Sequence, residues 1–216
     1  GFAMNTTVQL FQFAKWPDKG RVKTRLAATL GEDGALHAHI TLTLTVLEQL
    51  RQCGYPLALA WDHDLDEPPA GAAAILNAVA GYGIGQLIQQ GQDLGERMTQ
   101  ALSRGLEEAD RAIVVGSDCP SVDADYVAEA VAALEEADVV FGPSDDGGYV
   151  LIGARRTAPA MLQKVAWGSE TALEESVTAV RNAGLSVAIL APRWDVDEPE
   201  DWARFLSEFG QSPTGG

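Results

Sequence analysis

The sequence contains few cysteines and no long apolar run. Only Cys53 and Cys119 occur among its 216 residues, too few and too far apart for a disulfide framework or a zinc site. The longest apolar stretches, such as AIVV and YVLIG, are long enough for a strand but too short to cross a bilayer. No charged leader precedes an apolar segment at the N-terminus. We therefore expect a reduced, cytoplasmic protein without a membrane span.

Positive charge is also scarce. The chain has 15 Lys and Arg against 31 Asp and Glu, a formal net charge of −16, which argues against general attraction to nucleic acid or to an anionic membrane. The segment KWPDKGRVKTRL is the exception. Five basic side chains and one acidic side chain lie between Lys15 and Arg25, and we call residues 15–25 the basic loop. An anionic ligand would have to be bound locally, by this loop, although a solvated charged turn is the alternative.

Apolar, β-rich runs alternate with helical patterns, which predicts an α/β fold with a largely parallel sheet. The hydrophobic content of 46% suits one core, so we expect a single domain over residues 4–210, with residues 1–3 and 211–216 as tails. RAIVVG at 111–116 is continuously apolar, as a central parallel strand should be. Other strands are expected at 7–13, 56–61, 84–89, 138–142, 149–153 and 185–190. A first helix is expected within 22–30 with a stop at Gly31, and a second helix is expected to end at Gly54. Further helices are expected over 72–80, around Met98, from an N-cap at Asp123, over 171–182 and from Pro199. The TALE start of the helix over 171–182 has the pattern of a capping box.

Polar segments follow four of these strands, at the edge where ligands bind in open α/β sheets. They are the basic loop, GSDCPS (116–121), PSDDGGY (143–149) and DVDEPED (195–201). Lys and Arg neutralise phosphoryl oxygens, whereas carboxylates can hold Mg²⁺ together with phosphate oxygens. The combination predicts a site for a metal ion and a polyphosphate. The glycine spacings of a dinucleotide-binding fold and of a P-loop are both missing from the first loop.

Four longer segments carry a family resemblance: FAKWPDKGRVKTRLAATLG, the stretch from VVGSDCPS to YVLIGARR (114–156), WGSETALEES and DVDEPEDW. In this order they resemble the bacterial glycosyltransferase A-like proteins called selenodomain-associated transferases, in the nucleotide-diphospho-sugar transferase superfamily. The resemblance covers nearly the whole chain and implies a Rossmann-like glycosyltransferase A fold. The layout is more distantly similar to several guanylyltransferases and sugar-phosphate nucleotidyltransferases. The glycine pair that nucleotidyltransferases usually have early in the first loop is replaced here by AKWPDKG, so the resemblance leaves open whether the donor is a nucleoside triphosphate or a nucleotide sugar.

The resemblance also implies roles for individual residues. Asp118 would be a ligand of Mg²⁺ or Mn²⁺, with Asp197 as the second ligand and Asp195 as a possible substitute. Each aspartate could instead serve only in a turn or a helix entry. The donor phosphates would be bound by Lys15, Arg21, Lys23 and Arg25.

The DDGGY segment has two interpretations. In one, Asp146, the N–H groups of Gly147 and Gly148, and Tyr149 receive the acceptor. In the other, the segment is a tight turn whose glycines supply positive φ. The residues expected to act in catalysis are Asp118, Lys23 and Asp146.

The function expected from these observations is that of a Mg²⁺-dependent transferase with a nucleotide-activated donor and a small-molecule acceptor. Glycosyl transfer from a nucleotide sugar is favoured slightly by the whole-chain resemblance. One alternative is nucleotidyl transfer from a nucleoside triphosphate to a phosphorylated acceptor, and another is a non-catalytic nucleotide-binding module. The three histidines are too scattered for a triad or a zinc site, and Cys119 is expected to be a buried thiol.

Overall fold

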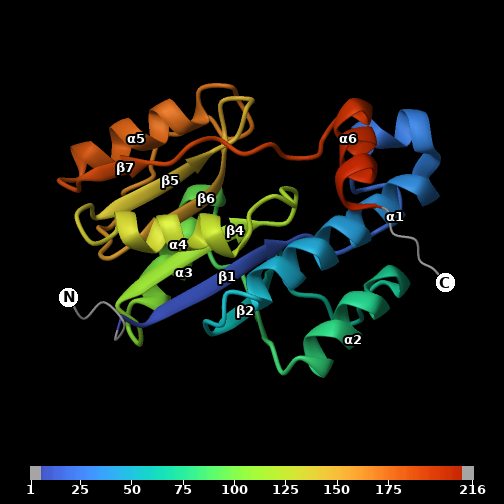
Figure 1. Cartoon of the computed structure of the whole chain (residues 1–216), viewed down its shortest axis with the longest axis horizontal. Coiled ribbons are helices and arrows are strands. Elements are labelled where there is room, and N and C mark those ends of the chain that lie inside the picture. Colours follow the sequence, from blue (N-terminus) through green and yellow to red (C-terminus); the bar gives the residue numbers. More distant parts are fainter. Residues whose placement is uncertain (1–5, 211–216) are drawn as a thin grey trace.

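The structure is a computed structural model, and it describes residues 6–210. Within this range the chain forms one seven-stranded sheet with helices on both faces (Figure 1). The strands lie in the order β3-β2-β1-β4-β6-β5-β7, and β6 runs antiparallel to both of its neighbours while the other pairs are parallel. The expected single α/β domain with a mostly parallel sheet is confirmed, whereas the tails 1–3 and 211–216 lie outside the described residues. The strands are β1 (Val8–Ala14), β2 (Leu57–Trp61), β3 (Gly85–Ile88), β4 (Arg111–Gly116), β5 (Val139–Pro143), β6 (Tyr149–Ala154) and β7 (Val187–Ile189).

The helices form two layers because successive residues of a strand point to opposite faces. On one face Phe11 and Phe13 of β1 pack with α3 and α5. On the other face Val8 and Leu10 pack with α1 and α4, and α2 extends this layer beside α1. The helices are α1 (Thr24–Arg51), α2 (Ala73–Gly81), α3 (Leu94–Gly105), α4 (Ala124–Ala133), α5 (Ala172–Asn182) and α6 (Pro199–Phe209), with a short 3₁₀ turn, η2 (Ala70–Ala72), before α2.

Helix α1 is broken near its start, and its first turns pack against the last helix. Gly31 has φ 76° and ψ 169°, outside the helical region, so the predicted stop at this glycine is confirmed. Leu26 and Leu42 of α1 form a cluster with Trp202 and Phe205 of α6, and Figure 1 shows these two segments side by side. This packing brings the C-terminal end of the basic loop next to residues 195–198.

One predicted helix cap is confirmed and one is wrong. Asp123 caps α4 as expected, by accepting from the backbone N–H of Tyr126. The capping box predicted in TALE is wrong: the Thr171 side chain makes no cap bond, because its hydroxyl donates to Glu175. A capping box occurs instead at α6, between Glu198 and Asp201. None of the helices within residues 6–210 has the length and apolar character needed to pass through a bilayer.

Candidate functional site

The polar segments predicted from the sequence meet at one edge of the sheet. The parallel strands β1, β4, β5 and β7 all end there, and the antiparallel β6 begins there. Strands β1 and β4 are neighbours, but the chain leaves β1 toward β2 on the opposite side. The connections therefore diverge between β1 and β4, which is where ligands bind in open α/β sheets. The basic loop and Asp118 flank this point.

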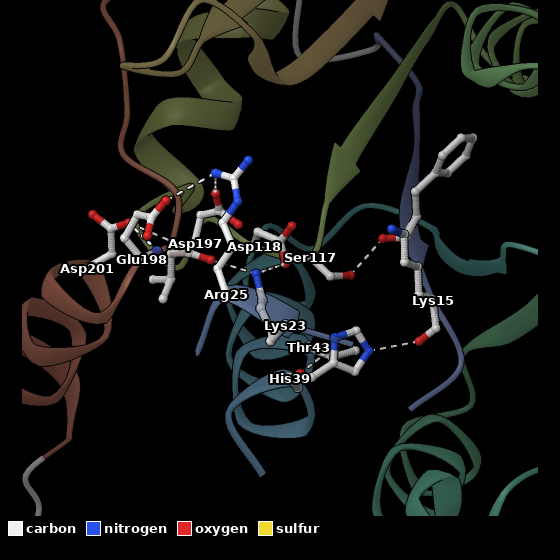
Figure 2. Close-up of polar contacts among 12 residues, drawn as sticks. Lys15, Lys23, Arg25, His39, Thr43, Ser117, Asp118, Asp197, Glu198 and Asp201 are labelled. Atoms are coloured by element: carbon white, nitrogen blue, oxygen red, sulfur yellow. Dashed lines mark hydrogen bonds and ion pairs between the residues drawn. The ribbon is translucent and has the colours of Figure 1, made fainter. Parts of the chain in front are cut away.

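Lys23 makes the central contact between these segments. It is the N-cap residue of α1 and has φ 49°, a left-handed conformation that few residues other than glycine adopt. Its ammonium lies 2.7 Å from Asp118 Oδ1 and donates to the backbone oxygen of Val196 at 2.5 Å (Figure 2). The Lys23 side chain is only 6% exposed, whereas that of Asp118 is 53% exposed. Asp118 therefore remains open to a ligand while it neutralises a buried cation.

Arg25 makes a second bridge between the basic loop and the end of the chain. Its Nη1 lies 2.6 Å from Asp197 Oδ2 and 3.1 Å from Glu198 Oε1 (Figure 2), and these two carboxylates raise the pKa of the guanidinium. Asp201 in turn accepts from the backbone N–H groups of Asp197 and Glu198. The helix entry thus holds the Arg25 partners in place.

The other basic side chains lie farther out. Arg21 is 81% exposed and pairs with Asp18 at 3.4 Å, and Lys19 pairs with Asp33 at 2.9 Å. Lys15 is exposed, and its backbone oxygen contacts His39 Nε2 at 2.9 Å. Of the four predicted phosphate-binding residues, the structure therefore brings Lys23 and Arg25 against the acidic segments and leaves Lys15 and Arg21 at the surface.

Carboxylates from three segments influence one another at this edge. The backbone N–H of Val196 donates to the backbone oxygen of Asp118 at 2.8 Å, so the segment after β4 lies beside residues 195–197. Partial burial, and then the negative charges of Asp146 and Asp118, raise the pKa of Asp195 to about 6. Asp195, the substitute ligand in the sequence prediction, therefore shares the environment of Asp118 and Asp146. The carboxylate of Asp197 instead forms an ion pair with Arg25.

This set of side chains fits a divalent cation that also has oxygen ligands from a substrate. Within the described range, no group of three or more His, Cys, Asp or Glu side chains is arranged to hold a metal ion by itself. Mg²⁺ does not require such a cage, because it is usually bound by one or two carboxylates with water and phosphate oxygens. Asp118 and Asp195 provide two carboxylates whose mutual repulsion a cation would relieve.

The DDGGY segment is a turn that is fixed against the start of α5. Gly147 has φ 91°, and a Cβ atom there would lie 2.0 Å from the backbone oxygen of Glu170. Asp146 accepts hydrogen bonds from the Ser144 hydroxyl and the Gly148 N–H. Tyr149 directs its hydroxyl to the buried Ser176 at 3.0 Å, and burial raises the pKa of the phenol. Asp146 is exposed and is therefore the member of this segment best placed to meet an acceptor, whereas the Gly148 N–H is used within the turn.

Three residues of the site, Glu198, His39 and Ser117, were not identified from the sequence, but the burial of Cys119 was predicted. Glu198 received no role, although its place before Pro199 in an acidic helix start could have marked it as a cap. His39 and Ser117 were also missed, and their contacts depend on tertiary packing that no local pattern indicates. Cys119 is buried as expected, and burial raises the pKa of its thiol to about 11.

Comparisons with known proteins agree with this fold. A curated relative, phosphoenolpyruvate guanylyltransferase of Sphaerobacter thermophilus, is 29% identical over 89% of each chain. The crystal structure of a proposed nucleotide-diphospho-sugar transferase from Desulfovibrio desulfuricans G20 is 30% identical with a TM-score of 0.81, and the match covers 96% of this chain and 89% of that one. A CMP:2-keto-3-deoxy-manno-octonic acid synthetase in complex with CTP is 14% identical with a TM-score of 0.59, covering 95% and 99%.

These relatives confirm the expectation of a transferase at the level of the superfamily. The fold is that of the nucleotide-diphospho-sugar transferases. A family model described as "Uncharacterized protein conserved in bacteria (DUF2064)" matches residues 43–169. The chain therefore belongs to the DUF2064 family.

Proposed function

We propose that this protein transfers a nucleotidyl group from a nucleoside triphosphate to a small acceptor in the presence of Mg²⁺ or Mn²⁺. The proposal depends above all on the meeting of Lys23, Asp118 and Asp195 at the divergence point between β1 and β4. The name of the curated relative and the CTP complex with the same fold favour nucleotidyl transfer. They outweigh the slight preference for glycosyl transfer that the sequence suggested.

The cations of the basic loop would bind the donor phosphates. Lys23 and Arg25 already lie at the site, the exposed side chain of Lys15 would bind the donor phosphates from the start of the loop, and Arg21 would add longer-range attraction. In nucleotidyl transfer an acceptor oxygen bonds to the α-phosphorus, the bond from that phosphorus to the bridging oxygen breaks, and pyrophosphate leaves. Negative charge then develops on the leaving group, where an ammonium group lowers the barrier.

The carboxylates would divide the remaining tasks. Asp118 and Asp195 would hold the divalent cation, with Asp197 keeping Arg25 in position. When bound, the cation supplies Lewis-acid stabilisation to the phosphate oxygens. Asp146 would orient the acceptor, because its side chain is exposed and its charge acts on Asp195. Such a reaction proceeds by positioning and electrostatic stabilisation, without a covalent enzyme intermediate.

Glycosyl transfer remains the second candidate, since the crystal structure that is 30% identical bears the name of a nucleotide-diphospho-sugar transferase. The same cations would then bind a diphosphate, and an acceptor would attack the anomeric carbon. A binding module without turnover is the third candidate. It would not need two neighbouring carboxylates, which are costly to hold together without a cation.

Two measurements test these candidates. Thermal shifts with each nucleoside triphosphate and with nucleotide sugars, with and without Mg²⁺, rank the donors, because a ligand that binds the folded state raises the Tm. Pyrophosphate release is then measured with the best triphosphate and a panel of small phosphorylated acids that includes phosphoenolpyruvate. We expect Mg²⁺-dependent release that requires the acceptor. Shifts with nucleotide sugars alone would favour glycosyl transfer, and binding without any turnover would favour the module.

A further inference from the structure

A connected set of buried polar side chains lies beneath the basic loop. His39 of α1 is 4% exposed, and Thr43, one turn later, is fully buried. His39 Nε2 contacts the Lys15 backbone oxygen at 2.9 Å, and the Thr43 hydroxyl donates to the His39 backbone oxygen at 2.8 Å (Figure 2). The carbonyl oxygen of Lys15 can only accept, so Nε2 of His39 must carry the proton in this contact.

The hydrogen-bond network continues from α1 through Gln12 of β1 to Ser117, directly after β4. Gln12 of β1 is fully buried, and its side-chain amide donates to the Thr43 backbone oxygen at 3.0 Å and to the Ser117 hydroxyl at 2.9 Å. Ser117 precedes Asp118 and donates to the Phe13 backbone oxygen at 2.7 Å. The network therefore holds the backbone oxygens of Phe13 and Lys15, on either side of the residue where β1 becomes the basic loop.

The position of His39 separates it from the residues that could touch a ligand. Its ring is buried and hydrogen-bonded to backbone, whereas Lys15 and Asp118 are open to solvent. Burial lowers the pKa of the imidazole despite the opposing effects of the Lys15 oxygen and Asp118, so the ring is neutral at pH 7 and adds no charge to the loop. A buried hydrogen bond of this kind restricts the geometry of the groups it joins.

Building on the proposed function, we infer that His39 is a positioning residue that fixes the start of the basic loop, and with it the side chain of Lys15, for binding the donor phosphates. It acts through one hydrogen bond, from Nε2 to the Lys15 oxygen. His39 lies outside the four polar segments at the sheet edge.

Four variants separate this role from general stability. His39→Leu keeps an apolar volume but removes the donor. His39→Gln keeps a donor that reaches the place of Nε2, whereas the amide of His39→Asn is too short to do so. His37→Leu is the matched control, because His37 lies two residues away on the exposed side of α1. The probe is inorganic triphosphate, titrated calorimetrically, with the Tm of each variant recorded alongside.

We expect His39→Leu and His39→Asn to weaken triphosphate binding about fivefold to tenfold, the loss of one buried hydrogen bond. His39→Gln and His37→Leu should stay within about twofold of the wild type. In a Lys15→Met background, His39→Leu should cost less than about twofold, because the side chain that it positions is gone. A purely structural effect would persist in that background.

Each result decides the matter. If the wild-type protein bound triphosphate and His39→Leu bound it equally well, the role of His39 would be refuted while the proposed function stood. Equal weakening by His39→Gln and His39→Asn, or full additivity with Lys15→Met, would refute it as well. A wild-type protein that bound no triphosphate would overturn the proposed function and this inference together. If His39→Leu did not fold, the comparison of His39→Gln with His39→Asn would still decide.

Discussion

Replacing Asp118 by asparagine separates two roles of one side chain. Asp118 neutralises the buried ammonium of Lys23, and in the proposed reaction it holds the divalent cation. Asparagine preserves the shape of the side chain but removes the charge on which both roles depend. The variant should therefore bind phosphate more tightly without metal and lose turnover with metal.

The size of the first effect follows from the geometry. The Lys23 ammonium lies 2.7 Å from Asp118 Oδ1, so a phosphate oxygen in contact with Lys23 would lie about 5 Å from the carboxylate. Because Asp118 is half exposed, an effective dielectric constant of about 40–80 applies, and two unit charges at that distance repel by about 1–2 kcal/mol. Removal of the repulsion corresponds to metal-free binding that is about five to thirty times tighter. The lost ion pair should lower the free energy of unfolding by about 1–2 kcal/mol.

The assay is calorimetric titration of inorganic triphosphate in the presence of a chelator, followed by turnover with Mg²⁺. We expect turnover of the Asp118→Asn variant to fall about a hundredfold or more, as when one electrostatic stabiliser of a transition state is removed. Normal turnover would show that Asp118 is not a metal ligand. Weaker triphosphate binding without metal would show that Asp118 does not compete with phosphate for Lys23.

Two further predictions concern stability. Gly147→Ala should lower the free energy of unfolding by about 2–4 kcal/mol, because its Cβ would clash with the Glu170 backbone at a positive φ. The control is Gly148→Ala, whose Cβ would lie 3.4 Å from the nearest atom, and it should change the urea midpoint little. Equal midpoints for the two variants would contradict the contact between the turn and Glu170. Asp138 is buried, and a hydrogen bond from Arg156, with help from Ser186 and Arg155, holds its pKa below the ordinary value of 3.8 despite burial. A depressed pKa in the folded state stabilises the protein above the ordinary value and ceases to do so as the pH falls below it. Asp138→Asn should therefore cost about 2–4 kcal/mol at neutral pH, and its deficit relative to wild type should shrink below about pH 4; a deficit independent of pH would refute the charge-based explanation.

Much of the fold could be predicted because the pattern of apolar residues is strong. The continuously apolar RAIVVG run became β4, which lies between β1 and β6 and is buried on both faces. The helix that stops at Gly31 follows from one glycine at the end of a four-residue periodicity. The predicted capping box at the start of α5 is wrong because Glu175 accepts hydrogen bonds from the Thr171 hydroxyl and from the backbone N–H of Ala166. That contact competes with local capping, and a local sequence pattern cannot reveal it.

The sequence predicts which segments form the candidate site, but it does not predict which side chains within these segments contact one another. Asp195 and Asp197 are two residues apart in an acidic stretch, so a spacing rule does not distinguish them as metal ligands. The turn into α6 separates them in space: the backbone of Asp197 is bound by Asp201 and its carboxylate faces Arg25, while Asp195 lies near Asp118 and Asp146. The Asp201 hydrogen bond and the packing of α6 against α1 together fix this difference.

The pairing of opposite charges at the site links the two ligands of the proposed reaction. Lys23 is neutralised by Asp118, and Arg25 by Asp197 and Glu198, so a donor alone meets the repulsion of these carboxylates and a divalent cation alone competes with Lys23. When both bind, the phosphates take over the cations of the loop and the carboxylates are free for the metal. Each ligand should then raise the affinity for the other by the same factor, as linkage requires. Asp118→Asn should reduce that factor toward one, since it removes the group for which Lys23 and the metal compete.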